Sequence, residues 1–166
     1  MAVHGDGDID EHQVRDAVIL DKERDLAEDP AFGFRQLVDI AERALSPGTN
    51  DPTTAVQSLD HLNDLLRSLA CRPLLPHVAT GENRTVRAVA PQPGWEDYVR
   101  LAFDEIRHWG AGSIRVHARI AAALDHLSAL VSGERAIVLE RQRHLLGARM
   151  GDLAEAEHAT VLLRRP

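Results

Sequence analysis

The sequence predicts an all-α protein, a single domain of about six amphipathic helices, and three observations support this. Every strongly periodic segment repeats its apolar residues at the 3.6-residue spacing of a helix. Aromatic residues make up only 4% of the 166 residues, so the core must consist mainly of Leu, Val, Ile and Ala. Proline and glycine mark the ends of the periodic segments. A length of 166 residues suits one domain.

The N-terminal part differs from the rest of the chain in charge. Residues 1–29 hold ten acidic and three basic side chains, whereas the remaining residues hold sixteen of each. We expect residues 1–8 to form a flexible acidic leader and residues 9–150 to form the helical domain. Residues 151–166 are expected to be a C-terminal tail, either helical or frayed. Within the domain, the first helix is expected over 9–27.

Two further helices, 30–45 and 52–70, are predicted around a tight polar connection. Asp-Pro pairs at 29–30 and 51–52 each place a capping carboxylate directly before a proline in the first helical position. A Ser-Pro-Gly run at 46–48 ends the earlier helix. A short connection between amphipathic helices predicts an antiparallel pair.

The second half of the chain contains one segment of different character. Residues 72–94 contain four prolines, two glycines and a β-favouring run at 85–90, which predicts a small β-hairpin within 74–90, turned at 80–83. Helices are then expected over 94–109 and 113–132, and from just after Gly133 to about 150.

Composition excludes several classes of protein. The net charge is −7 and no basic stripe is present, which argues against a nucleic-acid partner. Cys71 is the only cysteine, so no internal disulfide can form, and we expect it to be a small buried hydrophobe. There is no signal peptide and no apolar stretch of the ~20 residues that span a bilayer. We therefore expect a cytoplasmic chain without a transmembrane segment.

The segment at residues 23–62 resembles a known protein family in sequence. Residues 23–62, ERDLAEDPAFGFRQLVDIAERALSPGTNDPTTAVQSLDHL, resemble the C-terminal soluble part of a bacterial family of predicted membrane proteins, catalogued as domain of unknown function 2254. The runs DPAFGFRQLVDIA and ALSPGTNDPTTA carry the resemblance, and PQPGWEDYVRLAFDEIRHWG at 91–110 extends it more loosely, over roughly 15–145 in all. Family members typically place transmembrane helices ahead of this portion, and those helices are absent here. A natural stand-alone version and a fragment of a longer protein remain alternatives, and the resemblance implies no established activity.

The connection at 46–54 is the first candidate site. Free backbone N–H groups at the start of the third helix, neighbouring hydroxyls and nearby guanidinium groups could bind a small anion or other small ligand. The structural alternative is that Asp51 or Asn50 caps this helix, that Ser46 closes the preceding one and that the arginines pair with Asp39. The candidate ligand-binding residues are Arg35, Asp39, Arg43, Ser46, Asn50, Asp51, Thr53 and Thr54.

An enzyme, specifically an uncharacterised hydrolase, is the less favoured hypothesis. General acid–base catalysis needs ionisable groups that converge on one cleft, and no motif with a known mechanism is present. No catalytic residue is therefore assigned, and the scattered histidines lead us to expect neither a metal nor a cofactor. The residues that such a mechanism would use are Asp39, Asp60, His61, Asp104 and His108.

Trp95, Tyr98 and Trp109 form a candidate interface, because Trp and Tyr are frequent binding anchors. The alternative is that these aromatics belong to the core. Taken together, the sequence predicts a soluble regulatory or interaction module, similar to the cytoplasmic part of a predicted membrane protein. Its expected partner is a protein or a membrane component of its own family, which would hold it at the inner face of the membrane. A homo-oligomer is a further alternative.

Overall fold

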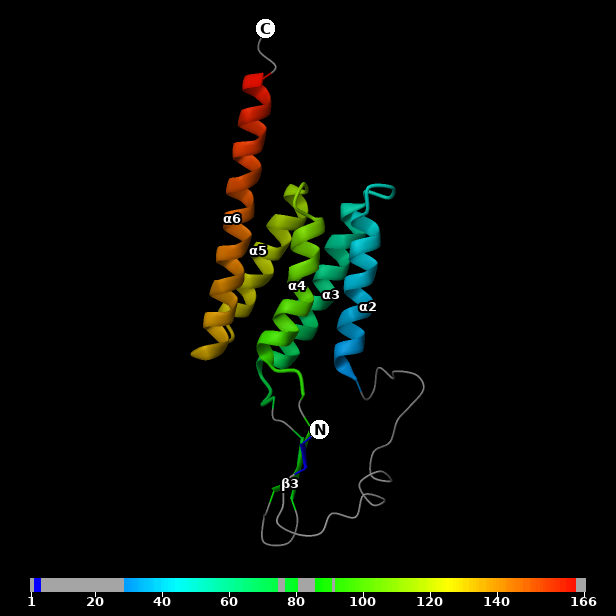
Figure 1. The fold of residues 1–166 in the computed structure, drawn as a ribbon, viewed down its shortest axis with the longest axis vertical. Coiled ribbons are helices and arrows are strands. Elements are labelled where there is room, and N and C mark those ends of the chain that lie inside the picture. Colours follow the sequence, from blue (N-terminus) through cyan, green and yellow to red (C-terminus); the bar gives the residue numbers. More distant parts are fainter. Residues whose placement is uncertain (1, 4–28, 75–76, 81–85, 91, 164–166) are drawn as a thin grey trace.

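The structure, a computed structural model, is a helical bundle with one small sheet (Figure 1). It describes residues 2–3, 29–74, 77–80, 86–90 and 92–163. The predicted all-α fold class is confirmed: these residues contain five helices and three short strands. The helices are α2 (Pro30–Leu45), α3 (Pro52–Ala70), α4 (Trp95–Trp109), α5 (Ile114–Ser128) and α6 (Glu134–Leu163).

The sheet contains the predicted hairpin. Strand β2 (His77–Thr80) pairs antiparallel with β3 (Val86–Ala90), and the turn between them lies outside the described residues. Strand β1 (Ala2–Val3) pairs with the other edge of β3, so residues 2 and 3 of the expected leader are part of the sheet. The rest of that leader and the helix expected over 9–27 lie outside the described residues.

The local capping signals set the ends of the first two described helices. Asp29 Oδ1 accepts a hydrogen bond from the Phe32 amide at 3.2 Å, which begins α2 at Pro30. Asp51 Oδ1 accepts from the Thr53 amide at 2.9 Å, which begins α3 at Pro52. Both helices therefore begin at the residues that the two Asp-Pro pairs predict.

Other ends differ from expectation. Helix α5 ends at Ser128 rather than near 132, and residues 129–133 form a turn in which Gly133 adopts a φ of 60°. Helix α6 continues past 150 to Leu163, in agreement with the helical alternative for the C-terminal tail. The expectation that Cys71 is buried was wrong: it caps the C-terminus of α3, where the chain leaves the bundle, and it is exposed.

Successive helices run up and down the bundle (Figure 1). Helix α2 packs on α3 and α4, α3 packs on α5, and α6 lies against α4 and α5. The core between them contains few aromatic residues, as the composition predicts, and it is mainly aliphatic. The largest fully buried side chains are Phe34, Val38, Leu59, Leu62, Leu66, Val99, Phe103, Ile106, Ile120, Leu124, Leu127 and Leu139.

Candidate functional site

The connection between α2 and α3 is stabilised by hydrogen bonds within itself. Ser46 Oγ donates to the Arg43 carbonyl oxygen at 2.8 Å, and the Asp51 amide donates to the Ala44 carbonyl oxygen at 2.7 Å. The Asp51 carboxylate accepts from the amides of Thr53 and Thr54 and from the Thr54 hydroxyl. These bonds, led by that of the Thr54 hydroxyl, lower the pKa of Asp51. A carboxylate therefore already occupies the N–H groups that an anion would need.

The two arginines of α2 do not converge on this connection. Arg35 reaches across to α4, where its NH1 group donates to Glu105 Oε1 at 2.8 Å. Its Nε group donates to Asp39 Oδ1 at 2.7 Å, which confirms the predicted pair. Arg43 is exposed and forms no ion pair with any residue that the structure describes.

Sequence reasoning missed Arg115, a neighbour of the connection. Its NH1 group donates to Thr53 Oγ1 at 3.2 Å, and its charge helps to lower the pKa of Asp51. Arg115 lies in the first turn of α5, so only the packing of α5 on α3 brings it to this place. No spacing in the sequence signals this contact.

The Arg35 side chain joins a cluster of three carboxylates between α2 and α4. Asp39 and Glu42 lie on its own helix and Glu105 lies on α4. Arg35 NH2 is 3.3 Å from Glu42 Oε2 and 2.7 Å from Glu105 Oε2, so one nitrogen holds both carboxylates. The Trp109 side chain lies near Glu42 and opposes the rise in the pKa of that carboxyl. One cation thus faces three acidic groups, and the cluster carries excess negative charge.

The two glutamates of this cluster differ in proton affinity. Burial, followed by a hydrogen bond with Glu105, raises the pKa of Glu42 above its ordinary value. The hydrogen bond from Arg35 lowers the pKa of Glu105. The same hydrogen bond to Glu105 is the main reason that the pKa of Arg35 is raised. A proton that binds this cluster would therefore reside on Glu42.

We expect Glu42→Gln to stabilise the protein at pH 7 by about 0.5–1 kcal/mol, since surface electrostatic effects are small. When the pKa of a carboxyl is raised in the folded state, its protonated form contributes stability to the fold. This contribution is complete at pH values below the pKa of the unfolded chain, which is about 4.5 for Glu42. That stabilisation is lost as pH rises through the raised folded value. The difference between E42Q and the wild type should therefore shrink as pH falls from 7 to 4. Urea unfolding at several pH values measures it.

Glu105→Gln is the matched control for this prediction. The pKa of Glu105 is lowered, so its contribution is present above the ordinary pKa and is lost as pH falls through the lowered value. At pH 7, E105Q should therefore destabilise the protein. Equal signs for the two variants would contradict the arrangement of charges described above.

The carboxylates named for a hydrolase are engaged in separate ion pairs, and the two histidines are not joined to them. Asp60 pairs with Arg119, and Asp104 accepts from Arg107 at 3.1 Å. His61 and His108 are exposed, and among the described residues no hydrogen bond joins either of them to these carboxylates. The described part of the chain also contains no group of three or more His, Cys, Asp or Glu side chains that could hold a metal ion.

The three candidate interface aromatics have different environments. Trp95 and Tyr98 are each only 6% exposed, and the Tyr98 ring lies 5.0 Å from that of Phe34. These two belong to the core, which was the alternative interpretation of the aromatics. Trp109 is 51% exposed at the end of α4. Of the three, only Trp109 offers a large surface to a partner.

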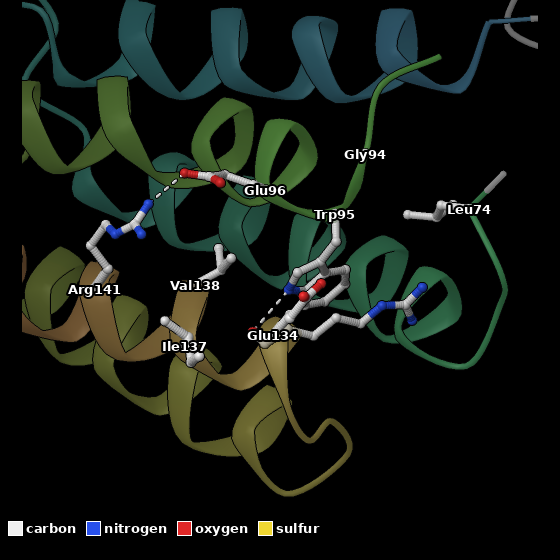
Figure 2. A pocket seen from close by; sticks show the side chains of 9 residues that line it. Leu74, Gly94, Trp95, Glu96, Glu134, Ile137, Val138 and Arg141 are labelled. Atoms are coloured by element: carbon white, nitrogen blue, oxygen red, sulfur yellow. Dashed lines mark hydrogen bonds and ion pairs between the residues drawn. The ribbon is translucent and has the colours of Figure 1, made fainter. Parts of the chain in front are cut away.

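An open cavity of about 500 Å³ lies beside Trp95, between α4 and the start of α6 (Figure 2). Trp95 Nε1 donates to the Arg135 carbonyl oxygen at 3.1 Å. The Arg135 guanidinium lies over the Trp95 ring and donates to the carbonyl oxygens of Ala70 and Arg72 at 2.7 Å each. Across the cavity, Arg141 pairs with Glu96 at 2.6 Å. Sequence reasoning missed this cavity, because its two walls come from helices about 40 residues apart.

The fold and these sites define a helical bundle module with an acidic interhelical cluster and an open cavity. The chain belongs to the family described as predicted membrane protein (DUF2254), which matches residues 1–126. Uncharacterized proteins of Mycobacterium tuberculosis and Mycobacterium bovis are each similar to it, with 35% identity over 146 residues. The match covers 84% of this chain, which spans only 27% of the length of each relative.

Two further comparisons concern the membrane and known structures. Among the described residues, no helix has both the length and the apolar character needed to cross a bilayer. No solved structure matches the chain.

Proposed function

We propose that this chain is a soluble regulatory or interaction module whose partner is a membrane component of its own family. The observation that supports this most strongly is the partial match to its relatives. The helical bundle corresponds to 27% of each mycobacterial relative, and the family is described as a predicted membrane protein. In those relatives the counterpart of this bundle is joined to a much longer remainder, with which it can interact. Such an interaction would place this module at the inner face of a membrane.

The turn between α4 and α5 is the surface best suited to that partner. Trp109 is 51% exposed and Ile114 is 81% exposed, and they lie on either side of this turn. Exposed tryptophan with a neighbouring aliphatic side chain is typical of binding anchors. The acidic cluster around Arg35 adjoins this surface through Glu42 and can supply polar contacts.

A binding measurement tests the proposal. The remainder of the M. tuberculosis relative, without the region matched by this chain, is purified in nanodiscs and titrated with this protein. We expect a dissociation constant in the micromolar range or tighter. Trp109→Ala should weaken binding about 30-fold, which corresponds to a hot-spot loss of about 2 kcal/mol.

Two controls accompany this experiment. Leu65→Ala removes an exposed apolar side chain of α3 away from the turn and should leave the dissociation constant unchanged. The matched region of the relative, expressed alone, shows whether the nanodisc preparation is competent to bind. Binding of that region without any binding of this chain would refute the proposal.

A further inference from the structure

Helix α6 is longer than the bundle that it packs on. It spans 30 residues, whereas α4 and α5 span 15 each. Its first half contacts them through Leu139 and Leu146, which are 0% and 6% exposed. Its second half extends beyond the ends of these helices (Figure 1). The extension continues an already formed helix, but most helical stability in proteins comes from packing, so a packing partner would stabilise it.

The first half of α6 also exposes an apolar surface. Ile137 is 61% exposed and Leu145 is 41% exposed, and Arg141 lies between them at helical spacing. Ile137, Val138 and Arg141 border the cavity beside Trp95 (Figure 2). The exposed side of this half therefore continues into a hollow that a second helix could cover.

The two halves of α6 carry opposite net charge in the sequence. Residues 134–148 contain three arginines and two glutamates. Residues 149–163 contain one arginine against one aspartate and two glutamates. Two α6 helices placed antiparallel bring the basic half of each against the acidic half of the other. A parallel pair would place like charges together.

We infer that α6 is a dimerisation helix and that its partner is a second copy of this chain, packed antiparallel with a two-fold axis near Ala148. The first half of each α6 then covers the second half of the other, which gives the extension its packing partner. Such an interface is isologous and closed, so assembly stops at the dimer. The inference rests on the proposed role as an interaction module and names one of its partners.

Cysteine cross-linking distinguishes this arrangement from the parallel one. In a Cys71→Ser background, Ala148→Cys places the two new thiols beside the two-fold axis. Ile137→Cys places them roughly 30 Å apart, at 1.5 Å of helix rise per residue. We expect oxidation to link A148C into a covalent dimer and to leave I137C monomeric on a denaturing gel. Linking of I137C as readily as A148C would overturn the antiparallel arrangement.

Sedimentation equilibrium of the full chain measures the association itself. We expect a dimer at tens of micromolar and a dissociation constant at least tenfold higher for Leu145→Glu. Leu65→Glu, a similarly exposed leucine on α3, is the matched control and should not change it. A monomer at all concentrations, or equal effects of the two variants, would overturn the inference. Neither outcome alters the nanodisc measurement, so failure of the dimer and failure of the proposed function are distinguishable.

Discussion

Phe103→Ala is expected to lower the free energy of unfolding by about 3–5 kcal/mol. Phe103 lies in α4, is 0% exposed and is one of the largest fully buried side chains. Its truncation leaves a cavity in a core that is otherwise mainly aliphatic. Because domains of this size are stable by about 5–15 kcal/mol, the variant should be close to unfolding at 37 °C. Urea unfolding followed by circular dichroism at 222 nm measures the change.

Ile114→Ala is the control for this substitution. Ile114 is also a large apolar residue, but it is 81% exposed in the first turn of α5. Its truncation should change the free energy of unfolding by less than about 0.5 kcal/mol. Similar losses for the two variants would mean that the bundle does not bury Phe103 as described.

The second large effect is expected at the turn between α4 and α5. Gly110→Ala should destabilise the protein by about 1–3 kcal/mol, because the turn has no room for a side chain. A Cβ atom there would lie 2.5 Å from Val116 Cγ1 and 2.7 Å from the Ile106 carbonyl oxygen. The second neighbour is backbone of α4, so it cannot move aside without disturbing the helix. Thermal and urea unfolding both report the loss.

Gly112→Ala, two residues further on, is the matched variant. A Cβ atom at Gly112 has nothing within 4 Å, and the residue is exposed. This substitution should be neutral or stabilise by up to about 1 kcal/mol, through a smaller entropy of the unfolded chain. If Gly112→Ala were as damaging as Gly110→Ala, backbone conformation rather than close packing would be the cause.

We expect the turn to affect partner binding as well as stability. Trp109 and Ile114, the residues proposed to bind the membrane partner, directly flank the segment that contains Gly110. A side chain at Gly110 would press on Val116 of α5 and on the backbone of α4, so the substitution should displace the two helices that carry Trp109 and Ile114. Gly110→Ala is therefore expected to weaken partner binding along with stability, whereas Trp109→Ala should affect binding alone.

Parts of the candidate site could be predicted because their causes are local. The Arg35–Asp39 pair follows from i, i+4 spacing on one helix. The Asp51 cap follows from the three residues after it. The contact of Arg35 with Glu105 could not be predicted, because 70 residues separate them. Many other carboxylates also lie on the outer faces of predicted helices and could have been its partner.

The sequence by itself determined the fold class, the bounds of α2 and α3, the hairpin and the family. Each depends on apolar periodicity or on turn and cap residues within a few positions of one another. Only the tertiary structure decided that Trp95 is buried while Trp109 is exposed and that the second half of α6 extends beyond the bundle. These features depend on which helices pack together and on how far each helix is shifted along the bundle axis. Helical periodicity identifies the apolar face of a helix, but it is the same at every turn and so specifies neither.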